Sequence, residues 1–267
     1  QLANAGYMIY ASDHRGHGHT ATKLGQFGPD GWNRTLLDLK EMIVSHRSEF
    51  PEIPVILLGH SMGSMLSQQY IELYGDTLDI VILSGSPGFT NQILTWIVKL
   101  IATVETWRLG DERESNLLQK LIFGDSNKGF EAGSEETAGD ETSLRETTGF
   151  EWLSRDPQQV KAYMDDPMCG FVPFPASLKQ VFAGASWTQK KTNIAAIPVT
   201  LPIYLFSGTA DPVHNELKDI ERLLTRYHDA GLSVETRFYN GGRHEMFNEI
   251  NREDVMQALL SWIDKNI

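Results

Sequence analysis

The chain has 267 residues, 41% of them hydrophobic, which is enough for one large α/β domain with its own core. Its 23 basic and 35 acidic side chains give a net charge of −12, which argues against a nucleic-acid-binding protein, because no excess of lysine and arginine would replace phosphate counterions. The single cysteine, Cys169, allows no internal disulfide, and no apolar run is long enough to cross a bilayer, so we expect a cytoplasmic protein without stable membrane insertion.

The first predicted elements lie at the very start of the chain. The opening stretch QLANAG is typical of the last turn of a helix that ends at Gly6. The stretch that follows, Tyr7–Ser12, is predicted to be a strand. A chain that begins inside a helix also predicts further sequence upstream of residue 1.

Four more short runs rich in Val, Ile, Leu, Tyr and Phe are predicted strands: Val55–Leu58, Ile80–Leu83, Ile203–Phe206 and Val234–Tyr239. Several are apolar nearly throughout, which favours strands covered on both faces. Apolar stripes with helical spacing begin at Leu36, Leu217 and Val255 and fill the gaps. Strands that alternate with helices predict an α/β fold with a mostly parallel sheet and helices on both faces.

The region from residue 87 to residue 197 breaks this alternation. No strand is predicted in it, whereas helices are predicted over 93–104 and 117–122 and after Pro157, and a loop over 130–143. An insertion of roughly a hundred residues is too long for a loop. We interpret residues 87–197 as a helical cap, or lid, inserted into a core formed by residues 1–86 and 198–267. The alternative is that this insertion is purely structural and has no functional role.

The stretch LLGHSMGSM, residues 57–65, places Ser61 between Gly59 and Gly63, after a predicted buried strand and before a predicted helix. A serine at such a turn exposes its hydroxyl, and small residues two positions away on either side avoid steric conflict. The backbone N–H of Met62 would lie at the helix N-terminus, where it can stabilise an oxyanion. This context predicts a nucleophile at Ser61. The alternative is a serine in an ordinary glycine turn.

A serine nucleophile needs a base and an orienting carboxylate, and two other predicted strand ends supply them. The strand in PIYLFSGTADPVH is followed by Asp211, and the strand in VETRFYNGGRHEMFNE is followed by His244. We therefore predict Asp211 as the acid and His244 as the base. His214, in the acid's own loop, is a rival base, and Glu245 is a poor rival acid, because adjacent side chains diverge.

The remaining histidines are not expected to take part in the chemistry. His60 belongs to the turn around Ser61, where it lines the pocket or packs beneath it. The stretch DHRGHGH invites a metal site, but its spacing is not a known zinc pattern. We therefore expect no metal and no organic cofactor, even though three histidines lie close together there: His14, His17 and His19.

The motifs ASDHRGHGHT, GHSMGS, SGTADPVH and GGRHEMFNEINREDV, in that order, resemble the α/β-hydrolase superfamily. Within it, nearly the whole chain is similar to the monoacylglycerol lipase and lysophospholipase branch, often called serine aminopeptidase S33. The cap stretch FEWLSRDPQQVKAYMDDPMCGF is similar to the cap-to-core segment of bacterial members. The resemblance implies an α/β-hydrolase fold with Ser61 as nucleophile, Asp211 as acid, His244 as base and Met62 as one oxyanion donor.

The start of the chain departs from this family. Members begin with two or three strands, and the third ends in a His-Gly motif that supplies the second oxyanion donor. That strand lies between the two that correspond here to Tyr7–Ser12 and Val55–Leu58. The resemblance therefore implies that N-terminal strands are missing. Their absence would leave unpaired backbone groups inside the sheet, so we expect these 267 residues alone to be poorly stable and weakly active.

These motifs together predict a serine carboxylic-ester hydrolase that acts through an acyl-enzyme. The expected partner is a small-molecule or lipid ester such as a monoacylglycerol, a lysophospholipid or another fatty ester. The cap's apolar helix and the run CGFVPF over 169–174 are expected to shelter the acyl chain. The alternatives are an S33-type aminopeptidase, a haloperoxidase or C–C hydrolase with the same triad, and a catalytically impaired homologue.

Overall fold

The computed structural model describes residues 1–89, 91–110, 113–130 and 147–267. Their strands form one parallel sheet whose spatial order equals the sequence order: β1 (Ile56–His60), β2 (Ile80–Ser84), β3 (Ile203–Gly208) and β4 (Val234–Tyr239). In the register of the sheet, Leu58 pairs with Ile82, Ile82 with Tyr204, and Tyr204 with Glu235. Four of the five predicted strands are therefore confirmed.

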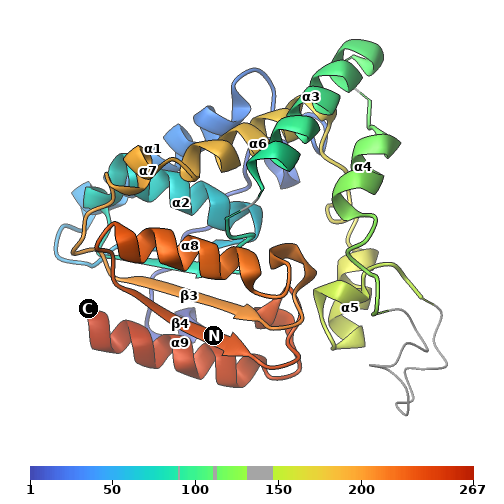
Figure 1. Cartoon of the computed structure of the whole chain (residues 1–267). Helices are drawn as coiled ribbons and strands as arrows, with labels where there is room; N and C mark the ends of the chain where they lie inside the picture. The colour runs from blue at the N-terminus through green and yellow to red at the C-terminus, as the bar shows by residue number, and fades with distance from the viewer. Residues whose placement is uncertain (90, 111–112, 131–146) are drawn as a thin grey trace.

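Helices cover both faces of this sheet (Figure 1). Alternate residues of the central strands, Val81 and Leu83 among them, pack on one face against α1 (Gly31–Glu49), α2 (Met62–Tyr74) and α8 (Lys218–Asp229). Their neighbours Ile80 and Ile82 pack on the other face, against α9 (Arg252–Asn266). This two-sided burial explains why β2 and β3 are continuous apolar runs in the sequence, because both faces of each strand are shielded from water.

The prediction of a strand over Tyr7–Ser12 is wrong. The chain begins with a single 3₁₀ turn, η1 (Ala3–Ala5), which Gly6 ends with a φ of 95°, and residues 7–12 then have no regular secondary structure. Within the described residues β1 pairs only with β2, so residues 7–12 have no neighbouring strand to accept and donate ladder hydrogen bonds. Met8, Ile9 and Tyr10 consequently stay about half exposed.

Five helices lie between β2 and β3 in the described part of the chain: α3 (Gln92–Leu109), α4 (Asn116–Phe123), α5 (Pro157–Asp165), α6 (Pro175–Thr188) and α7 (Lys191–Ile194). The first three confirm the predicted helices, and each has a side-chain N-cap: Asn91, Ser115 and Asp156 accept hydrogen bonds from backbone N–H groups of the first turn. Of the predicted loop over 130–143, all but residue 130 lies outside the described residues.

Helices α6 and α7 were not predicted from sequence periodicity, and α6 contacts α3 as well as α1 and α2. In Figure 1, α6 and α7 lie close to α1 and α2, while α3, α4 and α5 extend beyond one end of the sheet. The division into a cap over 87–197 and a core stays a prediction.

Short 3₁₀ turns complete the connections: η2 (Gly18–Thr20), η3 (Gly75–Thr77), η5 (Glu151–Leu153), η6 (Pro212–His214) and η7 (Met246–Asn248). None of the helices in the described part of the chain is long and apolar enough to span a membrane.

Candidate active site

Ser61 lies at the sharp turn between β1 and α2. Its backbone has a φ of 54° and a ψ of −117°, a conformation that non-glycine residues rarely adopt. The Ser61 N–H donates to the Ser84 carbonyl at 3.0 Å, and the Ser61 carbonyl accepts from the Ser64 N–H at 2.9 Å. These bonds hold the turn on both sides, so the hydroxyl stands at the carboxyl edge of the sheet.

The two glycines around Ser61 have different roles. A Cβ at Gly59 would come within 2.3 Å of both the Gly63 carbonyl oxygen and the Ser67 Oγ, whereas a Cβ at Gly63 would meet no described heavy atom within 4 Å. The predicted steric need for a small residue on both sides is therefore confirmed for Gly59 and wrong for Gly63. The close approach of β1 to the first turn of α2 explains the need at Gly59.

The structure brings together the three residues that the sequence singled out. His244 Nε2 lies 2.9 Å from Ser61 Oγ, and His244 Nδ1 lies 2.9 Å from Asp211 Oδ2. Because a carboxylate only accepts hydrogen bonds, Nδ1 of the neutral imidazole carries the proton, and Nε2 is free to accept the proton of the Ser61 hydroxyl. Asp211 and His244 are almost fully buried.

Asp211 is held by several donors besides His244. Its Oδ1 accepts the Val213 N–H at 2.9 Å, and its Oδ2 accepts the Ser207 hydroxyl at 3.2 Å. Burial raises the pKa of Asp211, but the charge of His244 and its hydrogen bond, together with His214 and the Val213 N–H, outweigh burial and lower the pKa overall. The carboxylate is therefore ionised at neutral pH, as an orienting acid requires.

Two rings flank the imidazole of His244. The ring of His60 lies 4.7 Å away, and the ring of Trp152, from the 3₁₀ turn η5, lies 5.0 Å away, both measured between centroids. Burial, reinforced by the nearby charge of His244, lowers the pKa of His60 to about 3. His60 is consequently neutral at physiological pH and adds no positive charge beside the base.

Met62 is the first residue of α2. The first N–H groups of a helix have no carbonyl of a preceding turn to bind, and the helix dipole adds partial positive charge there. The Met62 N–H next to Ser61 is therefore suited to receive a negatively charged oxygen.

The rival residues are placed elsewhere. His214 is fully buried, but its Nδ1 accepts the Leu217 N–H at 2.9 Å and its Nε2 therefore donates to the Gly208 carbonyl at 3.0 Å. The carboxyl group of Glu245 accepts from the Asn248 amide at 2.7 Å, whereas Asp211 is the carboxylate bonded to the imidazole. Across the described ranges no three His, Cys, Asp or Glu side chains form a cluster that could hold a metal ion.

Sequence reasoning missed Ser207 and Trp152 as neighbours of the triad. Ser207 ends the apolar run of β3 just before Asp211, so its position near the acid could be seen in the sequence, whereas its hydrogen bond to the carboxylate could not. In the run CGFVPF, Val172 and Phe174 are buried, and the Phe174 N–H donates to the Gly25 carbonyl at 3.0 Å; that the run shelters an acyl chain stays a prediction.

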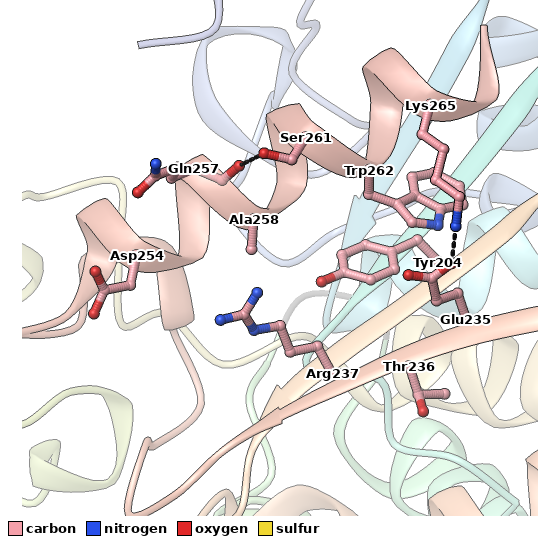
Figure 2. A pocket seen from close by; sticks show the side chains of 10 residues that line it. All are labelled: Tyr204, Glu235, Thr236, Arg237, Asp254, Gln257, Ala258, Ser261, Trp262 and Lys265. Carbon is pink, nitrogen blue, oxygen red and sulfur yellow. Dashed lines mark hydrogen bonds and ion pairs between the residues drawn. The ribbon is translucent and has the colours of Figure 1, made fainter.

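A groove of about 540 Å³ lies between β4 and α9, away from the triad (Figure 2). Tyr204 and Trp262 stack beneath it with ring centroids 4.9 Å apart, and the charged side chains around it have both signs. Lys265 lies 3.6 Å from Glu235, so part of this charge is paired within the groove. None of its lining residues belongs to the set around Ser61.

The sequence profile of the serine aminopeptidase S33 family matches residues 1–251. Among curated proteins, the chain is similar to a monoacylglycerol lipase of Mycolicibacterium smegmatis, with 26% identity over 97% of this chain and 79% of that protein. It is also similar to a monoglyceride lipase homolog of monkeypox virus, with 25% identity over 98% of this chain and 81% of that protein.

Solved structures show the same fold. A thermostable carboxyl esterase from Bacillus coagulans, in complex with glycerol, superposes with a TM-score of 0.81 at 24% identity, over 95% of this chain and 79% of that one. A monoacylglycerol lipase from Paleococcus ferrophilus gives a TM-score of 0.68 at 21% identity, over 100% and 86% of the two chains. The profile match over most of the sequence and the shared architecture lead to one conclusion: the chain belongs to the serine aminopeptidase S33 family and has the α/β-hydrolase fold.

Proposed function

We propose that this protein is a serine hydrolase of carboxylic esters that works through an acyl-enzyme on Ser61. The similarity to monoacylglycerol lipases supports a carboxylic ester hydrolase. The observation that carries the serine mechanism is the unbroken chain of contacts from Ser61 through His244 to Asp211, each at 2.9 Å. A buried acid, a correctly oriented imidazole and a hydroxyl at a strained turn are the parts that acyl transfer needs.

The steps follow from these positions. Ser61 Oγ attacks the ester carbonyl while His244 Nε2 takes its proton, and Asp211 stabilises the imidazolium that forms. The Met62 N–H stabilises the oxyanion. His244 then protonates the departing alcohol, and a water molecule activated by the same imidazole hydrolyses the acyl-enzyme. No step needs a metal or an organic cofactor.

We further propose fatty monoesters, such as monoacylglycerols or lysophospholipids, as the substrate class. Two curated relatives are named as a monoacylglycerol lipase and a monoglyceride lipase homolog. The helices between β2 and β3 carry large apolar side chains at their surface, including Trp96, Leu100 and Leu121, which suits an acyl substrate. Residues 87–197 would then act as the cap over the triad. A cytoplasmic location stays a prediction.

The decisive variant is Ser61→Ala. We expect it to abolish hydrolysis of a fatty p-nitrophenyl ester and covalent labelling by a fluorophosphonate probe, because Ser61 Oγ is the hydroxyl that His244 Nε2 contacts. Full activity in this variant would refute the serine mechanism.

A panel of monoacylglycerols, lysophosphatidylcholine, short-chain esters and an aminoacyl amide defines the substrate class. We expect the highest kcat/KM on a fatty monoester. Preference for the amide would identify an aminopeptidase instead, as the family's name allows.

A further inference from the structure

The loop that carries His244 is held both by a carboxylate of its own and by a segment that is distant in the sequence. Three consecutive backbone N–H groups donate outward: Arg243 to Glu249 Oε1 at 2.9 Å, His244 to the Trp152 carbonyl at 3.3 Å, and Glu245 to the Leu153 carbonyl at 2.8 Å. Two of these acceptors belong to residues 150–156, which we name the joint segment. The backbone at His244 and Glu245 is therefore fixed by the joint segment, and that of Arg243 by Glu249, farther along the same loop.

Glu249 is the side chain that ties the joint segment to this loop. It is fully buried. Its Oε1, which accepts from Arg243, also accepts the Arg155 N–H at 3.1 Å, and its Oε2 accepts from Arg155 Nε at 2.9 Å and from the Ile250 N–H at 2.9 Å. A buried carboxylate is tolerated only when it is paired and hydrogen-bonded, and here four N–H groups satisfy it.

Further bonds cross the same boundary. Arg243 Nη1 donates to the Glu151 carbonyl at 2.7 Å, and the Ser154 hydroxyl donates to the Asn248 carbonyl at 2.7 Å. The Trp152 indole also packs beside the imidazole. With contacts running in both directions, the joint segment and the His244 loop cannot move independently.

We propose that Glu249, paired with Arg155, is a positioning residue: it sets where His244 stands between Ser61 and Asp211 by locking the joint segment onto the histidine loop. This inference rests on the serine mechanism proposed above. Glu249 touches neither the substrate nor the reacting atoms, so it acts entirely through His244. The joint segment is then part of the catalytic scaffold and not only a connection between helices.

The isosteric change Glu249→Gln tests this role. The amide oxygen can still accept two of the four hydrogen bonds. The amide NH₂ would face the other two donors, Arg155 Nε and the Ile250 N–H, so these two hydrogen bonds are lost. A displacement of about 1 Å at a catalytic group can cost about a hundredfold in rate. We expect kcat and the rate of fluorophosphonate labelling to fall by about tenfold to a hundredfold, with KM little changed.

The matched control is Asp79→Asn. Asp79 is also a carboxylate that accepts from an arginine, Arg47 at 3.0 Å, and from a backbone N–H, that of Val55 at 2.8 Å, but it lies just before β2, at the opposite end of the sheet from Ser61. We expect it to lower the melting temperature without lowering kcat of the folded enzyme. Equal losses of kcat in both variants would overturn the positioning role. Should Glu249→Gln fail to fold, Arg155→Met carries the same test from the more exposed partner.

A double-mutant cycle separates positioning from general damage. If Glu249 acts through His244, Glu249→Gln should have no further effect on the residual rate in a His244→Gln background. An equal loss in both backgrounds would contradict the inference. The single variants Ser61→Ala and His244→Gln test the serine mechanism itself: if both retain full activity, the proposed function fails. If both are inactive but Glu249→Gln lowers the residual rate equally with and without His244→Gln, only the role of Glu249 is refuted.

Discussion

The backbone of Ser61 adopts a conformation that few non-glycine residues tolerate, and Gly59 provides the room for it. We predict that Gly59→Ala destabilises the protein by about 1–3 kcal/mol and removes activity, because the new methyl group would overlap the Gly63 carbonyl and force the turn to shift. Urea unfolding and ester hydrolysis measure the two effects. Gly63→Ala is the control: its Cβ meets open space, so a comparable loss there would contradict the steric explanation.

The lowered pKa of His60 leads to a prediction of how the stability of the protein depends on pH. Its pKa is about 3 in the folded protein and near the ordinary 6.5 when unfolded. Between these values the unfolded chain binds the extra proton, so the contribution of His60 to stability is present above about pH 6.5 and is lost as the pH falls toward 3.

We therefore predict that His60→Gln loses less stability than the parent protein between pH 7 and pH 5. The free energy of unfolding, measured with urea at both values, provides the comparison. Parallel pH profiles for the two proteins would show that the imidazole of His60 accepts its proton as readily when folded as when unfolded.

At the scale of elements, α2 carries a buried carboxyl group, that of Glu72, which lies near Tyr227 of α8. Both oxygens of Glu72 in α2, and the hydroxyl of Tyr227 in α8, lack a hydrogen-bond partner within the part of the chain that the structure describes. Burial raises the pKa of Glu72 to about 9. The folded state therefore keeps its proton where the unfolded chain has lost it, so stability is fully present below the ordinary pKa of 4.5 and is lost as the pH rises toward 9.

Replacing this carboxyl group should stabilise the protein at alkaline pH. We predict that Glu72→Gln, which keeps the shape and removes the titration, gains stability over the parent as the pH rises from 5 to 8.5. Glu72→Leu should add a gain that does not depend on pH, because it also removes the unsatisfied polar group. Chemical denaturation across this range measures both differences. If the difference in the free energy of unfolding between Glu72→Gln and the parent protein stayed constant with pH, the burial of an ionisable carboxyl would be contradicted.

At the scale of the whole molecule, α6 joins the helices over the sheet to those beyond its end. Gln180 accepts the Trp32 N–H at 3.0 Å and so binds α6 to the start of α1. A Cβ at Gly184 would come within 2.3 Å of the Trp32 ring. We predict that Gly184→Ala lowers the free energy of unfolding by about 1–3 kcal/mol through overpacking. Ala183→Ser, on the exposed side of α6, should be neutral in thermal unfolding; if it were equally damaging, the effect would come from the helix and not from the contact.

The sheet and the helices on its two faces could be predicted from short windows of sequence. Burial on both faces leaves continuous apolar runs in β2 and β3, and the three N-capped helices begin at Asn, Ser or Asp. Tyr7–Ser12 has an equally apolar pattern but no strand to pair with in the described part of the chain, and pairing is not a local property. Helix α6 escaped prediction because its buried face mixes Leu178 and Val181 with small or polar residues such as Gly184 and Thr188, so the apolar spacing in the sequence is weak.

The sequence by itself determined the candidate triad, because Ser61, Asp211 and His244 each follow a strand within a few residues, and parallel strands deliver their carboxyl ends to one edge. Their catalytic roles stay a prediction, while their mutual distances are now known. Only the tertiary structure decided what holds them in place. Arg155 and Glu249 are 94 residues apart, and no local pattern marks such a pair, because its energy comes from burial and charge that exist only once the chain has folded.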